Sequence, residues 1–450
     1  MPKHVRTGLA LSLLAAACAS SSHEERPAHG WPTGWPGPPV PAEQAAAVSV
    51  DADLDTLLTT AQVHNPGLQA AFHRWQAAEQ QAAASGTLPN PRLTLAGYVS
   101  EIQTRTGPLQ ARVGLQQPIP WFGKLDARNK RARAEAEAVR EDLERERLAL
   151  VHEVRDAWYE LAWLERAVAI TRGHIELVQH WEGLSRARLE TGLASHAEVI
   201  RTQVELGDLE NRLRSLDDLR RPVSARLNAA LDRAPGAPLP TPELPATGGQ
   251  ALDEDALLAG LPETSPELRG QQWIVTAAEH GIDLANKAFY PDLLVGAEVS
   301  FIGSRAGVDG SGDDALALTL GLDLPVWVSS NRAALRSAES LHAAALRALR
   351  QTQNELTVKL ELALYRSRDA QRRVTLYRKS LIPKGEEAVE ALSSAYESGD
   401  QGFLELIDAE RVLLEFELQA ARAEVDRAQA RSQIEHITGV RLPDTSEEMP

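Results

Sequence analysis

Four short segments of the chain alternate between apolar residues and polar or small residues. The clearest lies between Leu316 and Leu324, where every second residue is a leucine and the residues between them are Ala317, Thr319, Gly321 and Asp323. A period of two is typical of a β-strand with one apolar face and one polar face. The alternation predicts four strands, over residues 92–102, 109–118, 292–303 and 314–324.

Two much longer stretches, residues 124–232 and 331–438, have apolar residues at steps of three and four. On the return arm of the first stretch these residues are Leu206, Leu209, Leu213, Leu216, Leu219, Val223 and Leu227. This spacing is typical of long amphipathic helices in coiled-coil contact. Each stretch is therefore predicted to form a long helical hairpin. Pro222 and Pro383 are expected to kink or interrupt their helices.

The two halves of the chain have the same order of segments. Residues 65–68 (NPGL) match residues 265–268 (SPEL) at an offset of 200, and after one insertion Gly192 matches Gly399 at an offset of 207. A constant offset over many positions indicates a tandem repeat. Each repeat is predicted to begin with a modest helix, over residues 54–84 and 253–288, before its strands and hairpin. The predicted boundaries are 51–233 and 251–439 for the repeats, 234–250 for a proline-rich linker and 440–450 for a tail.

The N-terminus has the features of an export signal. Two basic residues precede a short apolar segment that ends at the only cysteine of the chain, Cys18. This segment is too short to span a bilayer, so residues 1–17 are predicted to be a signal peptide. The residues before Cys18 resemble a bacterial lipoprotein box, in which the cysteine becomes a lipid anchor and residues 18–50 form a tether. Ordinary signal-peptidase cleavage near Ala17 or Ala19 is the alternative.

The composition argues against several classes of function. The 450 residues include 47 Lys and Arg against 63 Asp and Glu, which gives a net charge of −16. An acidic chain without a basic patch repels nucleic acid. The 12 histidines show no ligand spacing, which argues against a metal site. Nothing in the sequence resembles a nucleophile elbow, so we expect neither enzymatic activity nor a cofactor.

Four strands are too few to close a barrel, and a membrane does not tolerate an open sheet edge in contact with lipid. Three copies of the chain would supply about twelve strands, which is within the range of outer-membrane barrels. The apolar strand faces would then contact lipid, and the polar faces would line a lumen. The sequence therefore predicts a mainly α protein with a transmembrane β-barrel, in which a homotrimer closes both the barrel and a tube of helical hairpins.

Several features together resemble TolC-type outer-membrane efflux proteins. They are the lipoprotein box, the tandem halves, the NPxL start at 65–68, the QPIPWFGK segment at 117–124 and the paired TG and SG turns at Gly192 and Gly399. The resemblance covers residues 51–439 and implies a lipid-anchored outer-membrane duct that extends into the periplasm. It also implies a periplasmic adaptor, an inner-membrane pump of the RND type, and efflux or type I secretion. The IPWFGK motif in this segment is similar to the sequence of the heavy-metal branch of the family.

The candidate site lies at the turn between the last two long helices. Gly399 and Gly402 interrupt the helical spacing there, and Glu405 and Asp408 follow directly. Because the two carboxylates are three residues apart, they share one face of a helix. Acidic residues in a first helical turn also stabilise the helix dipole, so the pair has an explanation that needs no pore.

By resemblance, the turns between long helices form a periplasmic tip at which the tube narrows. The residues that match the constriction are Glu198, Tyr396, Glu405 and Asp408. In a trimer, each acidic position would form a ring of carboxylates that attracts cations. The residues that match the tip turns and adaptor contact are Gly192, Leu193, Ala194, Gly399 and Gly402. Gln401 stands where some members of the family have a gating arginine.

An exported coiled-coil scaffold, or a periplasmic adaptor without a pore, is the competing hypothesis. Such a protein would bury one strand face inside a small β-domain and leave the other in water. A duct requires instead that the leucines between 316 and 324 face lipid. The exposure of the strand faces therefore distinguishes the two hypotheses. The transported substrate stays open, because metal ions, drugs and secreted proteins all fit these patterns.

Overall fold

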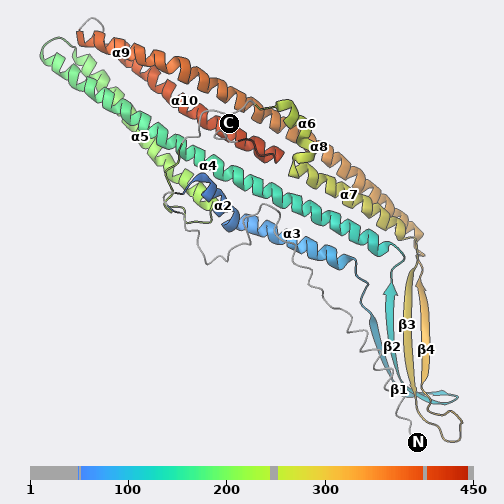
Figure 1. The fold of residues 1–450 in the computed structure, drawn as a ribbon. Coiled ribbons are helices and arrows are strands. Elements are labelled where there is room, and N and C mark those ends of the chain that lie inside the picture. The colour runs from blue at the N-terminus through green and yellow to red at the C-terminus, as the bar shows by residue number, and fades with distance from the viewer. Residues whose placement is uncertain (1–48, 50–51, 244–251, 399–402, 444–450) are drawn as a thin grey trace, which may run out of the picture.

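The computed structural model describes residues 49, 52–243, 252–398 and 403–443. These residues form an elongated molecule, with a layer of long helices and a four-stranded sheet at one end (Figure 1). The predicted signal peptide, the candidate anchor Cys18 and the turn residues Gly399 and Gly402 lie outside the described residues.

The first half of the described chain contains two short helices, two strands and two long helices. They are α2 (Leu54–His64), α3 (Pro66–Ser85), β1 (Arg92–Thr104), β2 (Gly107–Ile119), α4 (Lys124–Glu190) and α5 (His196–Ala230). The first strand therefore ends two residues beyond the predicted range, and the second begins two residues before it. The two strands meet in a tight hairpin at the end of the molecule.

The second half repeats this order. It contains α6 (Glu254–Thr264), α7 (Pro266–Lys287), β3 (Asp292–Ile302), β4 (Ala315–Asp323), α8 (Val328–Leu376), the π-helical turn η1 (Tyr377–Leu381), α9 (Ile382–Ser398) and α10 (Phe403–Thr438). The predicted fold class, mainly helical with four strands in each chain, is confirmed.

Two prolines split the helices that precede the strands. The single helices predicted over 54–84 and 253–288 are wrong, because each is a pair of helices. Pro66 and Pro266 begin α3 and α7, and the residue before each proline is extended, with ψ of 119° at Asn65 and 120° at Ser265. Proline disfavours the helical conformation in the residue before it but fits the first turn of a new helix.

The two prolines within the hairpins have different effects. The interruption predicted at Pro383 is confirmed, because the π-helical turn η1 ends at Leu381, two residues before it. Proline removes a helical hydrogen bond, and irregularities in long helices occur at prolines and at π-bulges. At Pro222 a kink or an interruption is predicted, and the interruption is wrong, since α5 continues through this residue. Leu216 and Leu227, on either side, are buried against the core and hold α5 in place.

The long helix α4 lies in the middle of the helical layer. It contacts α3 and α5 on one side and α7 and α10 on the other, and α8 and α9 lie beyond α7 and α10 (Figure 1). The layer thus consists of two long helical paths and two pairs of shorter helices placed end to end. One hydrophobic cluster joins α2–α5 to α9 and α10, and a smaller one joins α6, α7, α8 and the end of α10.

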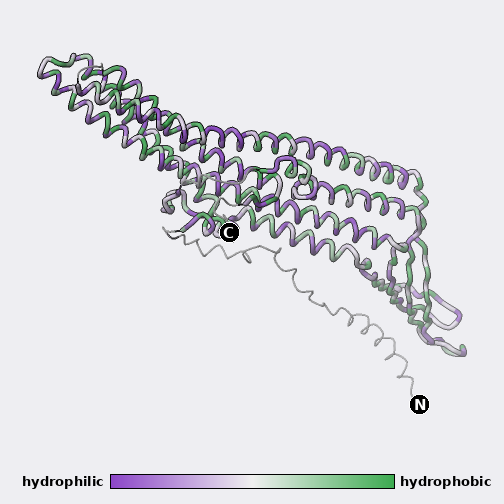
Figure 2. The backbone as a smooth tube through the Cα atoms, turned by 45° about the horizontal axis from the view of Figure 1, so that its top comes forward, coloured by the Kyte–Doolittle hydropathy of each residue, from purple (hydrophilic) through white to green (hydrophobic). Residues whose placement is uncertain are grey.

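The sheet is antiparallel with the order β1-β2-β3-β4, so the pairing of β2 with β3 joins the two halves of the chain. Leu95, Val113, Val299 and Leu316 are neighbours across the four strands and share one face. This face is open in a single chain: Leu316 is 71% exposed and Leu318 is 83% exposed. Hydrophobic positions recur along the strands in Figure 2.

The opposite face of the sheet carries polar and small residues. Arg112 of β2 and Glu298 of β3 form an ion pair there at 2.9 Å. Ala317 of β4 is the register partner of Glu298, and Ala317 therefore lies on this polar face. The outer edges of β1 and β4 have no partner strand among the described residues.

None of the described helices is both long enough and apolar enough to cross a membrane.

Candidate functional site at the helical tip

A glycine in a left-handed conformation closes the turn between α4 and α5. Gly192 has φ of +75°, which residues with a side chain rarely adopt. Its N–H donates to the carbonyl of Leu189 at 3.0 Å, and the N–H of Leu193 donates to the carbonyl of Arg188 at 2.8 Å. The two bonds form a Schellman motif, which satisfies the last carbonyls of α4. Gly192 therefore has a structural role in a single chain.

Leu193 and Ala194 form the outer surface of this turn. The side chain of Leu193 is 71% exposed. Ala194 is half-buried, and its N–H donates to the carbonyl of Arg188 at 3.2 Å. Leu193 is thus accessible at the end of the molecule, where another protein can reach it.

Glu198 lies in the first turn of α5 and takes part in a capping box. The N–H of Glu198 donates to the hydroxyl of Ser195 at 3.3 Å, and the N–H of Ser195 donates to the carboxylate of Glu198 at 3.4 Å. A capping box satisfies two backbone N–H groups that the helix itself cannot. In a single chain, Glu198 therefore stabilises the start of α5.

Tyr396 is buried between the ends of the two hairpins, with 1% of its surface exposed. Its hydroxyl forms a hydrogen bond of 2.9 Å with the hydroxyl of Ser185 on α4. The guanidinium of Arg188 lies 4.6 Å from the centre of its ring and also donates to its carbonyl. The ring of Phe403 packs at a centroid distance of 5.4 Å. Tyr396 thus joins the end of α9 to the end of α4.

Glu405 and Asp408 are exposed in the first turns of α10. The carboxylate of Asp408 lies 3.8 Å from Arg411 one turn further along the helix. Among the described residues, no ion pair joins either carboxylate to another helix. The structure therefore places these two residues on one exposed face of α10, as predicted, whereas Tyr396 is buried.

Asp408 is the first residue of a polar stripe that runs along α10. Positions three or four apart share one face of a helix. At this spacing α10 carries Asp408, Arg411, Glu415, Gln419, Arg422, Asp426, Gln429 and Gln433. Other faces of α10 bury Leu406, Ile407, Leu414 and Leu418. One polar face thus extends from the tip almost to the end of the helix.

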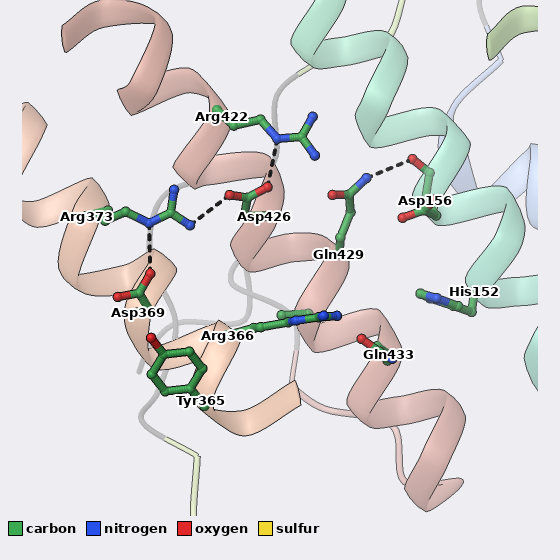
Figure 3. A pocket seen from close by; sticks show the side chains of 11 residues that line it. His152, Asp156, Tyr365, Arg366, Asp369, Arg373, Arg422, Asp426, Gln429 and Gln433 are labelled. Carbon is green, nitrogen blue, oxygen red and sulfur yellow. Dashed lines mark hydrogen bonds and ion pairs between the residues drawn. The ribbon is translucent and has the colours of Figure 1, made fainter. Parts of the chain in front are cut away.

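The stripe leads into an open cavity of about 540 Å³ between α4, α8 and α10. Figure 3 shows Asp426 between two arginines, with Arg373 of α8 and Arg422 each donating to it at 2.8 Å. His152 and Asp156 line the cavity from α4. The charges of the wall largely neutralise one another, which suits a surface in contact with water. In the described part of the chain, no cluster of His, Cys, Asp and Glu could hold a metal ion.

Next to the stripe, buried charges join the two hairpins. Glu205 of α5 is 3% exposed and accepts a hydrogen bond of 2.6 Å from Nε of Arg411. His174 of α4 bonds through Nδ1 to Glu410 at 2.6 Å and through Nε2 to Glu417 at 2.9 Å, and both glutamates lie on α10. These contacts connect the first hairpin to the second over several turns.

The charge state of His174 follows from its surroundings. Burial alone would lower the pKa of His174, but the hydrogen bonds to Glu410 and Glu417 outweigh burial and raise the pKa to about 9. The imidazole is therefore protonated at neutral pH, and both ring nitrogens donate. Glu410 is fully buried, so its carboxylate depends on this cation for compensation.

Sequence reasoning missed this cluster. His174 and Glu410 are 236 residues apart in the chain, so their contact arises only when the hairpins pack together. A signal was nevertheless present, because Glu410 lies between Leu406 and Leu414 in the apolar face of α10. A carboxylate at such a position needs a partner on a facing helix.

Comparisons with known proteins identify a family and a fold that fit this arrangement of helices and strands. The family model described as outer membrane efflux protein matches residues 57–232 and 258–440. The fusaric acid resistance protein FusA of Burkholderia cepacia is 26% identical over 272 residues, and the match spans 57% of this chain and 51% of FusA, about half its length. The pyoverdine export outer membrane protein OpmQ of Pseudomonas putida is 23% identical over 463 residues, which is 96% of both chains. The solved outer-membrane channel OprN has the same fold, with a TM-score of 0.73 at 19% identity over 91% of this chain and 96% of OprN.

Proposed function

Because the chain belongs to the outer membrane efflux protein family, we propose that it is the outer-membrane exit duct of a tripartite efflux system. The duct carries substrates from an inner-membrane pump and its periplasmic adaptor through the periplasm and the outer membrane. It works as a channel, and we assign it no catalytic step.

The main support for this proposal is the outward-facing apolar side of the sheet. Leu95, Val99, Leu316, Leu318 and Leu320 are each at least 70% exposed in a single chain. Apolar side chains at this density on a strand face are expected to lie against lipid. The opposite face holds the Arg112–Glu298 ion pair and is suited to a water-filled lumen.

Three copies of the chain complete the barrel. The outer edges of β1 and β4 present unpaired backbone groups, which lipid cannot satisfy. Pairing β4 of one copy with β1 of the next, around a three-fold axis, leaves no open edge and gives about twelve strands. The polar stripe of α10 then lines the helical tube that continues the barrel.

The far end of the hairpins is the periplasmic tip in this proposal. The exposed carboxylates of Glu405 and Asp408 form rings around the opening, and cations are attracted to such rings. Glu198 and Tyr396 support the constriction from behind, through the capping box and the bond to Ser185. Gly192, Leu193 and Ala194 contact the adaptor, together with the predicted turn residues Gly399 and Gly402.

The pump is of the RND type, and a lipid on Cys18 anchors the chain to the outer membrane. FusA is named for fusaric acid resistance and OpmQ for pyoverdine export. The names of these two relatives therefore refer to different small molecules. We therefore propose that the pump, and not the wall of the duct, selects the substrate.

A scaffold or adaptor without a pore would need a different sheet. Such a domain buries one strand face in its own core, whereas here the apolar face of β4 is exposed from Leu316 to Leu322. No described segment covers it. The exposed face therefore favours the duct over the competing hypothesis.

Single-channel conductance in a planar bilayer tests the proposal. The purified protein is expected to show a small, cation-selective conductance, and Glu405→Ala/Asp408→Ala is expected to lower the cation selectivity. The control is Glu386→Ala/Glu390→Ala, which removes two exposed carboxylates from α9 and not from the stripe. If all three proteins show equal cation selectivity, the carboxylates of Glu405 and Asp408 do not determine which ions pass. A folded, membrane-inserted protein without any conductance would contradict the duct itself.

A further inference from the structure

A second cavity, of about 300 Å³, lies where α10 ends and α7 begins, between α4 and α8. It borders the larger cavity of Figure 3, since His152 and Gln433 line both. Its lining combines cations, imidazoles and a helix start. The polar residues that contribute are Arg145, His152, Ser265, Glu267, Lys359, Gln433 and His436.

Two polar groups in this lining have no hydrogen-bond partner. Ser265 is 1% exposed, and its hydroxyl makes no hydrogen bond, although it occupies the position that caps α7. The Nδ1 atom of His436 is also buried without a partner. Buried polar groups in native proteins are almost always satisfied. These groups therefore indicate that something else occupies the cavity.

The first repeat shows how the same position is satisfied by the chain itself. Asn65 matches Ser265 in the repeat, and its side chain accepts a bond of 3.0 Å from the N–H of Leu68. The same side chain donates to the carbonyl of Ala230 at 3.0 Å, which joins the start of α3 to the end of α5. The shorter Ser265 makes neither bond. At the corresponding junction of the second repeat, a cavity is left.

The electrostatic environment of the cavity favours an anion. Arg145 and Lys359 contribute two positive charges, against the single carboxylate of Glu267 among the lining residues. The start of α7, a helix of 22 residues, adds backbone N–H groups without helical acceptors. Burial, and then His152, Arg145 and Lys359, lower the pKa of His436 to about 4. The imidazole is therefore neutral and has a proton to donate.

We propose that this cavity binds a small inorganic oxyanion such as phosphate or sulfate, with Ser265, Lys359 and His436 as its side-chain ligands. The hydroxyl of Ser265 and one ring N–H of His436 donate to the anion, and Lys359 supplies charge from α8. Arg145 is already bonded to Asp142 at 2.5 Å and contributes through its field. The anion thereby links α7, α8 and α10 at a junction where Ser265 and His436 have no partner among the described residues.

Titration of the purified full-length protein with sodium phosphate tests this site. Calorimetry is expected to show saturable binding of phosphate and of sulfate, and none of chloride at equal ionic strength. Ser265→Ala and Lys359→Gln are each expected to weaken binding roughly tenfold or more, since each removes an interaction with a charged group. Lys359 is exposed, so its variant is expected to fold.

Two further variants make the test specific. Lys384→Gln removes an exposed lysine from α9 and should leave phosphate affinity unchanged. Ser265→Asn restores the side chain of the first repeat, and it is expected to abolish binding while the thermal unfolding midpoint without phosphate rises. Equal affinity in wild type, Ser265→Ala and Lys359→Gln would overturn the proposal. Absence of saturable binding, or acetate binding as tightly as phosphate, would overturn it as well. The test measures binding alone, so its outcome is independent of whether the protein conducts ions.

Discussion

In the sheet, apolar side chains point outward and charged side chains meet across neighbouring strands. Along α10 the arrangement is reversed, with apolar side chains inside and a polar stripe outside. Leu318 of β4 is 83% exposed, whereas Leu406 of α10 is fully buried. One chain therefore has two regions that are built for different surroundings. In the proposed duct, one face of the sheet contacts lipid. The helices are adapted to water, with buried charges satisfied by partners on facing helices.

A charge on the apolar face of the sheet should have the largest effect on assembly in the membrane. Leu318→Arg is expected to destabilise the membrane-inserted protein by about 2–4 kcal/mol per chain, the cost of an arginine near the middle of a bilayer. In a trimer this cost arises three times. The amount of heat-resistant oligomer in the outer-membrane fraction measures the effect.

The neighbouring residue provides the matched control for that substitution. Ala317 points to the opposite face, beside Glu298, so Ala317→Arg is expected to assemble and to change only the conductance. Equal loss of oligomer in both variants would show that the two faces of β4 do not differ in their surroundings.

In the helices, removing one buried partner should have the largest effect on the stability of the purified protein. His174→Ala leaves the fully buried Glu410 without its cation, and loss of one partner of a buried pair costs about 3–5 kcal/mol. Denaturant unfolding of the purified protein measures the loss. His180→Ala, at an exposed position on the same helix, should have little effect. In His174→Leu/Glu410→Leu, much of the stability should return, because no buried charge then lacks its partner.

Two histidines whose pKa values are shifted in opposite directions predict a maximum of stability near neutral pH. The pKa of His174 is raised from 6.5 to about 9, so its stabilisation is complete below pH 6.5 and is lost as pH rises through 9. The pKa of His436 is lowered to about 4, so its stabilisation is present above pH 6.5 and is lost as pH falls through 4. Each contributes at most roughly 3 kcal/mol.

Unfolding midpoints measured against pH separate these two contributions. The loss at high pH should be smaller in His174→Gln, and the loss at low pH should be smaller in His436→Gln. If both variants keep the pH profile of the wild type, other groups control the pH dependence of stability.

The sequence predicted the elements well where one local pattern decides the structure. Alternation located β4, because each leucine between 316 and 324 faces the same side of one sheet. The breaks at Pro66 and Pro266 were missed although proline at a helix start is a local signal, since the apolar spacing continues across both. At Pro222 the local signal predicted an interruption that does not occur. There, contacts of α5 with α4 outweigh the tendency of proline to break a helix.

The candidate site was predicted only in part, because its buried half depends on packing. The shared face of Glu405 and Asp408 follows from their spacing. The bond between Tyr396 and Ser185 joins residues 211 positions apart, so neither segment alone identifies the partner. Residues with a polar group inside an apolar face, such as Ser185 and Glu410, were the available signals.

The smallest predicted effect concerns the bond that joins the hairpins at the tip. Tyr396→Phe removes the hydroxyl and leaves that of Ser185, which is fully buried, without a partner. An unsatisfied buried hydroxyl costs about 1–3 kcal/mol, whereas removing both partners is close to neutral. Denaturant unfolding should therefore show that Tyr396→Phe is less stable than Tyr396→Phe/Ser185→Ala. If the double variant loses the sum of the two single losses, the residues act independently, and the tip is held by the packing of Tyr396 against Arg188 and Phe403.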